Sequence, residues 1–240
     1  MRAMILAAGE GTRLRPLTET VPKALVEVAG RPLIDYAVKA VARCGIEEVV
    51  VNLYHLGEHI RDHLADGRRF GVRVSYSEET SLLGSGGGIR HARRLLGEGT
   101  FVTLNADTII DIDLAPVLRF HREKRAAATM VLRKDPRMAE YGLIYIDRDS
   151  RVARFLKHVR PGAPEPLEPY MFTGVQVLEP TVFAHMPAQG AFSITEITYP
   201  SMLASGEPIF GYPFEGPWLT VGTPDELAHA RRVLSGRALD

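Results

Sequence analysis

A glycine-rich, cationic segment near the amino terminus has the residue types needed to bind phosphate groups. Gly9 and Gly11 are followed closely by Arg13 and Arg15, and Lys23 comes shortly after them. Glycines allow backbone N–H groups to turn toward phosphate oxygens, and the three side chains concentrate positive charge beside them. The segment therefore indicates a polyphosphate site. The alternative is a tight turn with a solvated basic face, because isolated GxG turns are common.

Two standard nucleotide-binding motifs do not fit this segment. The dinucleotide-binding motif has a third glycine where this chain has Leu14, and an acid where the second strand ends in Asn52. A P-loop of the form GxxxxGKS or GxxxxGKT occurs nowhere in the 240 residues. The phosphate chemistry therefore belongs to a different kind of loop.

A carboxylate that could bind a cation follows an apolar run farther along the chain. Asp107 comes just after Phe101–Asn105, which has the pattern of a buried strand. Carboxylate oxygens suit Mg²⁺, which is usually bound by one or two carboxylates together with substrate phosphates. The alternative for Asp107 is a helix N-cap or a turn residue.

These residues need a sheet to position them, and the first half of the chain predicts one. Short β-like runs alternate with helical patterns, which predicts right-handed βαβ units and a largely parallel sheet. The expected strands are Ala3–Ala8, Glu48–Asn52, Val72–Tyr76 and Phe101–Asn105, and the expected helices are Pro32–Arg43, Gly57–Leu64 and about Gly87–Leu96. Ligands of such sheets lie beyond the carboxyl ends of the strands, so the loops after Ala8, Tyr76 and Asn105 are the expected sites.

The second half predicts more strands than helices and reads as a lobe built onto the parallel sheet. The expected strands are Ala126–Arg133, Leu143–Asp147, Arg151–Leu156 and Tyr170–Leu178, and helices are expected at Thr195–Ala204 and Pro224–Leu234. The charged run Arg119–Arg125 is typical of an exposed helix end. We interpret the whole chain as one domain.

Composition limits the partners. The formal net charge is zero, with 29 basic and 29 acidic residues, which argues against general binding of nucleic acid or acidic membrane. The single Cys44 excludes an internal disulfide, and no apolar run approaches the roughly 18 residues of a membrane helix. We expect a cytoplasmic protein.

Seven motifs along the chain together resemble one protein family. The chain resembles the sugar-1-phosphate nucleotidyltransferases, also called nucleotide-sugar pyrophosphorylases, through seven motifs in order. They are Ala7–Thr18 with Pro22-Lys23, Gly30–Ile34, Leu83–Ile89, Asn105-Ala106-Asp107, Tyr141-Gly142-Leu143, Thr173-Gly174-Val175 and Trp218–Pro224. No hexapeptide repeat follows them in this chain.

The resemblance implies an α/β fold with a Rossmann-like, mainly parallel mixed sheet flanked by helices and a smaller β-rich sugar-binding lobe. Residues 1–125 would form the nucleotide-binding half and residues 126–240 the sugar-binding half of one domain. The implied reaction joins a nucleoside triphosphate to a sugar-1-phosphate and releases pyrophosphate, with Mg²⁺ as cofactor. A homo-oligomer is compatible with the family.

The resemblance also implies roles for single residues. Arg13 and Lys23 would be catalytic and Asp107 would hold Mg²⁺. The implied nucleotide-binding residues are Leu6, Ala8, Gly9, Gly11, Thr12 and Gly86, and the implied sugar-binding residues are Gly142, Lys157, Thr173 and Gly174.

The nucleobase stays open between uracil and guanine. The run Gly86–Ile89 is similar to N-acetylmuramate-1-phosphate uridylyltransferases, whereas Leu83-Gly84-Ser85 is closer to mannose-1-phosphate guanylyltransferases. UTP and GTP are therefore the favoured donors.

Three departures from the family pattern define an alternative. Thr220 stands where the family usually has a second metal-binding Asp, Lys157-His158 replaces a Glu-Lys pair, and Ala106 replaces a glycine. These changes allow a nucleotide-sugar-binding regulatory subunit with weakened catalysis. Glu215 or Asp111 could replace the missing carboxylate if the fold brings either one close to Asp107. A third alternative is transfer to a non-sugar phosphate such as phosphocholine.

A histidine motif offers a competing metal chemistry. His55–His59 matches HxxEH, and His63 follows four residues later. The alternating charged residues around it are typical of a solvated helix face, with Leu56, Ile60 and Leu64 facing inward. We therefore disfavour a zinc site. Trp218 is interpreted as a packing residue.

Overall fold

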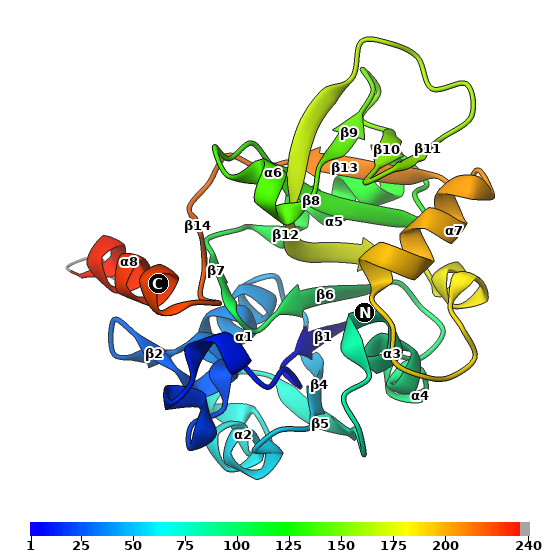
Figure 1. Cartoon of the computed structure of the whole chain (residues 1–240). Helices are drawn as coiled ribbons and strands as arrows, with labels where there is room; N and C mark the ends of the chain where they lie inside the picture. Colours follow the sequence, from blue (N-terminus) through cyan, green and yellow to red (C-terminus); the bar gives the residue numbers. More distant parts are fainter. Residues whose placement is uncertain (236–240) are drawn as a thin grey trace.

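Four parallel strands form the centre of the amino-terminal half. The computed structural model describes residues 1–235. The strands are β1 (Arg2–Leu6), β4 (Glu48–Leu53), β5 (Arg73–Glu78) and β6 (Phe101–Asn105), in the order β6-β1-β4-β5 (Figure 1). Leu6 is in register with both Asn52 and Asn105, so these three strands end at the same edge of the sheet.

Helices cover both faces of this sheet because its strands are apolar on both sides. Ala3 and Ile5 of β1 belong to one core cluster and Met4 to the other, as expected for side chains that alternate between faces. The first face packs against α1 (Leu33–Arg43) and α2 (Gly57–Leu64), and the second against α3 (Gly84–His91) and α4 (Arg93–Leu96).

The long strand β12 (Glu168–Leu178) joins the two halves of the molecule. Its carboxyl-terminal part pairs antiparallel with β6 and its amino-terminal part with β9 (Ile144–Ile146), and an irregularity between Phe172 and Gln176 separates the parts (Figure 1). Strands from both halves of the chain, from β1 at residue 2 to β13 at residue 213, therefore belong to one ten-stranded sheet. The division into a nucleotide half and a sugar half stays a prediction.

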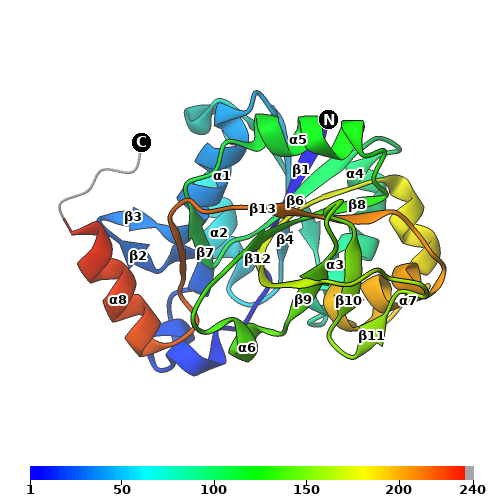
Figure 2. The same ribbon diagram turned by 90° about the horizontal axis from the view of Figure 1, so that it is seen from above.

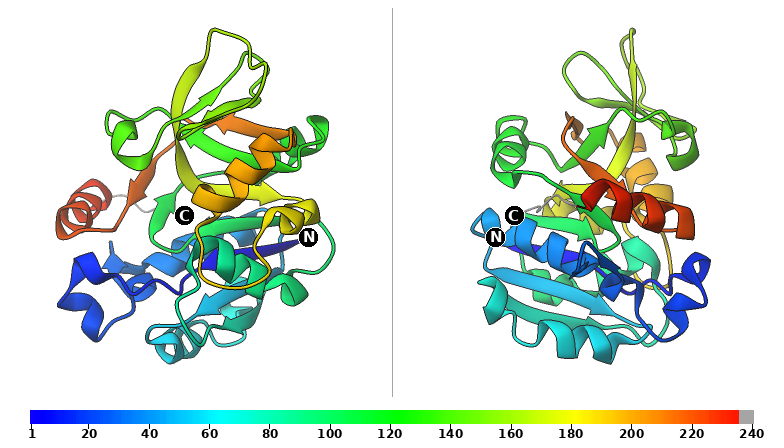
Figure 3. Two further views of the ribbon diagram at one scale, coloured as in Figure 1. Left: turned by 45° about the vertical axis from the view of Figure 1, so that its right-hand side comes forward. Right: turned by 90° about the vertical axis from the view of Figure 1, so that its left-hand side faces the viewer.

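A β-rich lobe projects from this sheet. It contains β9, β10 (Val152–Phe155), β11 (His158–Val159) and the start of β12, all antiparallel, and both views of Figure 3 show it above the parallel strands. Beside it, β13 (Ile209–Pro213) pairs in parallel with β8 (Ala128–Arg133).

The remaining elements close the fold around its open edge. The strands β7 (Thr108–Ile110) and β14 (Trp218–Thr220) form a separate antiparallel pair. The helix α8 (Pro224–Leu234) packs against β2 (Glu27–Val28), which pairs with β3 (Arg31–Pro32), as Figure 2 shows. The other helices are α5 (Leu114–Glu123), α6 (Met138–Tyr141) and α7 (Tyr199–Ala204).

Most predicted elements are present, with shifted ends. The helix predicted from Gly87 begins at Gly84 and breaks into α3 and α4 at Ala92. The helix predicted over Thr195–Ala204 is a π-helical turn over Ile194–Thr198 followed by α7. None of the described helices is long and apolar enough to cross a membrane.

Candidate functional site

A cleft of about 210 Å³ opens at the carboxyl ends of β1, β4 and β6, the edge at which the sequence predicts a ligand. Three loops line it, one after each of β1, β5 and β6. The lining residues are Leu6, Ala7, Ala8, Gly9, Gly11, Lys23, Ala24, Asn52, Leu82, Gly84, Ser85, Asn105, Ala106 and Asp107. The fold thus gathers most of the predicted nucleotide-binding loop around one cavity.

The first glycine loop is held in shape by contacts that require glycine. Gly11 has φ +65°, and a Cβ there would lie 2.9 Å from the Thr18 methyl group. The Thr18 hydroxyl donates to the Gly11 carbonyl at 2.8 Å, and His55 Nε2 lies 2.9 Å from the Thr18 carbonyl oxygen. Since the Thr18 side chain is fully buried, the loop has a fixed geometry rather than that of a solvated turn.

The central electrostatic feature is an ion pair across the cleft. Lys23 Nζ lies 2.6 Å from Asp107 Oδ2, although the two residues are 84 positions apart in the chain. The Lys23 side chain is 13% exposed and that of Asp107 is 33% exposed. Thr108 Oγ1 donates to the other carboxylate oxygen at 3.4 Å. The carboxylate predicted to bind metal and the ammonium predicted to bind phosphate thus lie in direct contact.

The Arg13 side chain lies against the turn at Gly222, between β14 and α8. A Cβ at Gly222 would lie 2.7 Å from Arg13 Nη2, so the guanidinium lies directly against this turn. Glu226 Oε2 accepts a hydrogen bond from the Gly222 N–H at 2.7 Å and fixes this turn. Within residues 1–235, Arg13 makes no ion pair, so its charge is available to an anionic ligand.

The residues near Asp107 fit a metal site that relies on ligand phosphates. Thr220 is in register with Thr108, and the Val221 N–H donates to the Asp107 carbonyl at 3.0 Å, so Thr220 lies beside Asp107. In the part of the chain that the structure describes, no group of three or more His, Cys, Asp or Glu side chains could hold a metal ion. One carboxylate with phosphate oxygens and water satisfies Mg²⁺.

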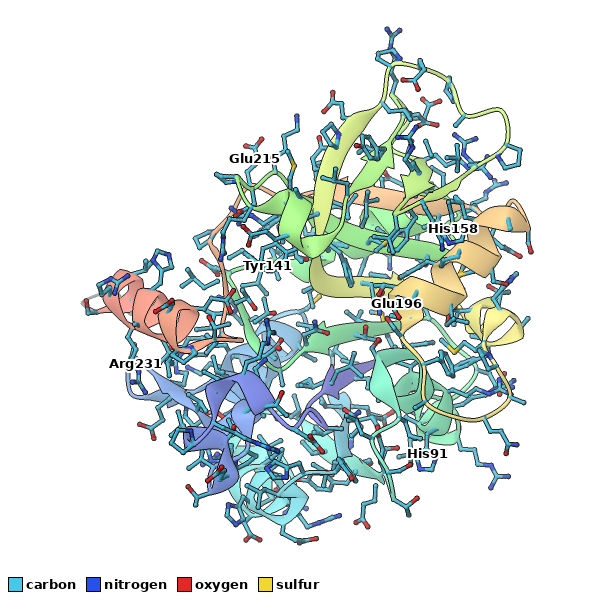
Figure 4. The ribbon with its side chains drawn as sticks, viewed as in Figure 1. His91, Tyr141, His158, Glu196, Glu215 and Arg231 are labelled. Carbon is cyan, nitrogen blue, oxygen red and sulfur yellow. The ribbon has the colours of Figure 1, made fainter. Side chains whose placement is uncertain are left out.

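Neither possible substitute carboxylate lies close to Asp107. Asp111 follows β7 at its far end and pairs with Arg43 at 3.1 Å. Glu215 is exposed and precedes β14 at the same far end (Figure 4). Three residues of strand, about 10 Å, separate that end from the Asp107 corner. The expectation that Glu215 or Asp111 could replace the missing carboxylate is therefore wrong.

The second glycine loop serves the cleft through Gly84 and Ser85. The glycines that follow pack instead against the segment before α7: Gly86 and Gly87 donate to the Phe192 carbonyl at 2.9 and 3.2 Å. A Cβ on Gly86 would collide with the Phe192 ring, and Gly86 does not line the cleft. Its role in nucleotide binding stays a prediction, and the structure gives it a packing role.

A buried hydrogen-bond network, which was not predicted from the sequence, joins the two glycine loops. Asn52 Oδ1 accepts from the Ala7 N–H at 2.8 Å, and Asn52 Nδ2 donates to Glu79 Oε1 at 2.7 Å. Glu79 Oε2 accepts from the Leu83 N–H at 3.0 Å. Asn52 is 3% and Glu79 7% exposed. The sequence signal that could have predicted this network is a polar residue at the end of each of two neighbouring strands, Asn52 in β4 and Glu79 after β5.

The four predicted sugar-binding residues lie on three segments of the chain and differ in exposure. Gly174, with φ +90°, packs against the Asn105 side chain at the edge of the cleft. The Thr173 hydroxyl is 1% exposed and donates to the Val131 carbonyl at 2.9 Å, so it is already engaged. Gly142, with φ +87°, follows α6, and Lys157 is exposed in the β10–β11 turn.

Tyr141, the last residue of α6, connects α6 with α8. Tyr141, labelled in Figure 4, donates to Glu226 Oε1 at 3.0 Å. Burial, and then this hydrogen bond, raises the pKa of Tyr141 to about 12, so the phenol stays protonated and keeps donating at neutral pH. Glu226 therefore links the lobe to the turn that carries Gly222.

The discounted motifs have structural partners of their own. In the HxxEH segment, His55 bonds the Thr18 carbonyl, and the nearby His63 Nε2 lies 2.6 Å from Asp35. Trp218 is 9% exposed and donates to the Thr173 carbonyl at 2.9 Å, which confirms it as a packing residue.

The fold and the cleft together define a class: α/β proteins with a cleft between glycine loops at the carboxyl edge of a Rossmann-like sheet. Residues 2–235 match the family model described as nucleotidyl transferase, and the chain belongs to this family. The resemblance to sugar-1-phosphate nucleotidyltransferases is confirmed by the names of its relatives.

Two curated relatives illustrate the similarity. The chain is 32% identical to a UTP–glucose-1-phosphate uridylyltransferase of Synechocystis, over 98% of this chain and 64% of the relative. It is 33% identical to a mannose-1-phosphate guanylyltransferase of Mycobacterium tuberculosis, over 93% of this chain and 62% of the relative. The chain thus spans less than two thirds of the length of these relatives.

Solved structures confirm the fold. A Bacillus anthracis protein solved with sucrose and provisionally named glucose-1-phosphate thymidylyltransferase superposes with a TM-score of 0.84 at 23% identity, covering 100% of this chain and 97% of that one. The protein HddC of Yersinia pseudotuberculosis superposes with a TM-score of 0.78 at 19% identity, covering 97% and 99%. The expected mixed sheet flanked by helices is confirmed.

Proposed function

We propose that this protein transfers a nucleotidyl group from a nucleoside triphosphate to a sugar-1-phosphate, forming a nucleotide sugar and pyrophosphate. Membership of the nucleotidyl transferase family supports this proposal. The observation that carries it is the meeting of Lys23 and Asp107 at 2.6 Å in a cleft walled by two glycine loops, with Arg13, which makes no ion pair within residues 1–235, on the same 3₁₀-rich segment.

The reaction requires cations because both substrates are anionic. Two unit charges 4 Å apart repel by about 4 kcal/mol at an effective dielectric constant of 20, and several such pairs arise as a sugar phosphate approaches a triphosphate. Arg13 and Lys23 offset this repulsion and orient the triphosphate for in-line attack. The sugar-phosphate oxygen forms the new bond to the α-phosphorus, and the bond to the bridging oxygen of the pyrophosphate breaks.

Proton transfer is not needed in this step. The attacking phosphate oxygen is already ionised at neutral pH, and pyrophosphate leaves as an anion. The guanidinium of Arg13 and the ammonium of Lys23 stabilise the charge that develops on the leaving group. The chain therefore contributes by binding, orientation and electrostatics.

Asp107 is the residue that would hold Mg²⁺. The bound metal supplies charge neutralisation on the phosphates of the nucleotide. The chain offers one carboxylate at this position, with Thr220 beside it, so binding of the metal depends on phosphate oxygens from the substrate.

We infer UTP or GTP as the donor, because the relatives are named as a uridylyltransferase and a guanylyltransferase. The sugar-1-phosphate would enter from the side of the β-rich lobe, where Gly174 lies against Asn105 at the edge of the cleft and Lys157 carries an exposed positive charge.

Pyrophosphate release tests the proposal. A panel of nucleoside triphosphates and sugar-1-phosphates is incubated with Mg²⁺, and we expect release with one pair at a rate that Arg13→Ala lowers about 100-fold, the cost of removing one preorganised donor. Arg119→Ala is the matched control, because Arg119 is exposed on α5 and does not line the cleft. Release no faster than in Arg13→Ala with every pair would contradict the proposal.

A second candidate function is a nucleotide-sugar-binding regulatory subunit with little turnover. Thr220 favours it, because this neutral residue precedes Val221, which bonds the Asp107 carbonyl, at a position where the family usually has a second carboxylate. If this second candidate is correct, we expect the protein to bind a nucleotide sugar tightly but not to cleave it when pyrophosphate is added. Turnover in either direction would eliminate it.

A further inference from the structure

A second cavity, separate from the cleft, is lined by arginines. It has a volume of about 620 Å³ and lies between the end of α3, the start of α4 and the segment 188–190. Its lining residues are Leu83, Gly87, Arg90, His91, Arg93, Arg94, Ala188, Gln189 and Gly190, none of which lines the cleft. We call it the arginine groove; His91 at its edge is labelled in Figure 4.

The positive charge of the arginine groove is not neutralised by the protein. No Asp or Glu lines it, and in the structure of residues 1–235 none of its three arginines forms an ion pair. Arg90 donates to the Phe183 carbonyl at 3.2 Å, and the Arg93 guanidinium lies 5.1 Å from the centre of the Phe183 ring. Both contacts orient a guanidinium and leave its charge in place.

This arrangement costs stability unless an anion is bound. Arg90 and Arg94 are four positions apart along nearly continuous helix, where like charges repel. The chain as a whole is neutral, so Arg90, Arg93 and Arg94, which form no ion pair with the described residues, are a local excess that global charge does not explain. Guanidinium groups bind phosphate through paired hydrogen bonds, and the Gln189 side chain adds a further donor.

We propose that the arginine groove binds a phosphorylated small molecule. Its volume falls in the range of sites for small organic ligands and is larger than an inorganic phosphate requires. The groove is a local concavity on a neutral protein, which distinguishes it from the extended cationic surface that nucleic acid needs. The proposal concerns a site apart from the cleft and goes beyond the proposed function.

Calorimetric titration tests the site directly. Inorganic pyrophosphate and a hexose bisphosphate are titrated into the full chain without added metal. Besides any binding in the cleft, we expect a binding event that Arg93→Gln/Arg94→Gln weakens about tenfold or more, because two charge-assisted contacts are lost. The ligand with the higher affinity shows whether a free polyphosphate or a phosphorylated sugar is preferred.

The control removes two arginines elsewhere. Arg119 and Arg122 are exposed on α5, and Arg119→Gln/Arg122→Gln lowers the net charge equally without touching the groove. Arg13→Gln separates any binding in the cleft, so failure of the proposed function and failure of this proposal give different results. Equal affinities in wild type and Arg93→Gln/Arg94→Gln would overturn the proposal, as would tighter binding of a single-stranded oligonucleotide than of both small anions.

A second measurement does not depend on how the double variant folds. In the amide NMR spectrum, the hexose bisphosphate is expected to shift the Gly87 and Gly190 resonances of the wild type, since both glycines line the groove. Arg94→Gln alone, an exposed change, should reduce these shifts at a given ligand concentration. Unchanged Gly87 and Gly190 resonances at millimolar ligand would refute the site.

Discussion

At the scale of single residues, the chemical motifs predicted candidates whose positions the structure gives and whose roles stay predictions. Arg13, Lys23 and Asp107 were each chosen from local sequence, and the fold brings Lys23 and Asp107 into contact. The contact itself was not predictable, because it depends on a pairing across 84 positions. The same holds for Asn52 and Glu79, whose partners are set by the order of strands rather than by neighbouring residues.

Thr220 allows a direct test of the metal site. In Thr220→Asp, a second carboxylate beside Asp107 is expected to lower the Mg²⁺ concentration for half-maximal activity about tenfold, equivalent to about 1.4 kcal/mol of binding free energy. Thr220→Asn is the control of matched size without charge. An identical metal titration in wild type and Thr220→Asp would show that this side chain does not face the metal.

Lys23 allows a test of the cation that contacts Asp107. Lys23→Met keeps the length of the side chain and removes its charge, so we expect the rate of pyrophosphate release to fall about 10- to 100-fold through loss of a charge-assisted contact. Lys39→Met, on α1 and away from the cleft lining, should keep the wild-type rate. A rate within twofold of wild type for Lys23→Met would count against a role in the reaction.

Elements were predicted when they are long and periodic. The helix α1 and strands β1, β4 and β6 were found because their apolar residues recur over five or more positions. The strands β7 and β14 were missed because each has three residues and pairs with a segment about 110 positions away. The strand β13 was missed as well, since its run Ile209–Pro213 contains a glycine and a proline.

The network between the glycine loops makes a prediction about how elements hold together. Glu79→Ala leaves the Asn52 amide and the Leu83 N–H without their buried acceptor, so we expect a loss of about 2–4 kcal/mol in the free energy of unfolding, measured in urea.

Two variants calibrate that measurement. Glu79→Gln keeps an acceptor for only one of the two donors, so its loss should be roughly half as large. Glu123→Ala, at the exposed end of α5, should change stability by less than about 0.5 kcal/mol. Equal stabilities for Glu79→Ala and Glu123→Ala would mean that the network does not hold the loops.

At the scale of the whole molecule, the sequence predicted the parallel half of the sheet and the additional strands but not how they join. The strand β12 pairs with β6 on one side of its irregularity and with β9 on the other. Nothing local to residues 168–178 specifies those partners, because antiparallel pairing with a strand about 70 positions earlier is a tertiary choice.

A buried histidine of α5 predicts how stability depends on pH. His121 is 2% exposed, and its Nδ1 and Nε2 lie 2.8 Å from Thr129 Oγ1 and 3.1 Å from Glu179 Oε1. Burial lowers the pKa of His121, although Glu179 opposes the shift. The unfolded chain therefore binds this proton more readily than the folded protein, and stability is lost as the pH falls below about 6.5.

Urea unfolding between pH 7.5 and 5 checks this dependence. His121→Asn should be less stable at pH 7.5 but lose less stability on acidification than wild type, because the titrating group is gone. His229→Asn, which removes an exposed histidine of α8, should follow the wild-type curve. If His121→Asn and wild type lose stability in parallel, His121 is not the responsible group.

The Lys23–Asp107 contact has a consequence for the order in which charges assemble. The Lys23 ammonium is a direct counterion for the Asp107 carboxylate, so a free divalent ion would have to displace it. An incoming triphosphate gives the ammonium a new partner and frees the carboxylate. We therefore expect nucleotide and magnesium to bind together, with the metal bound more weakly in the absence of a triphosphate.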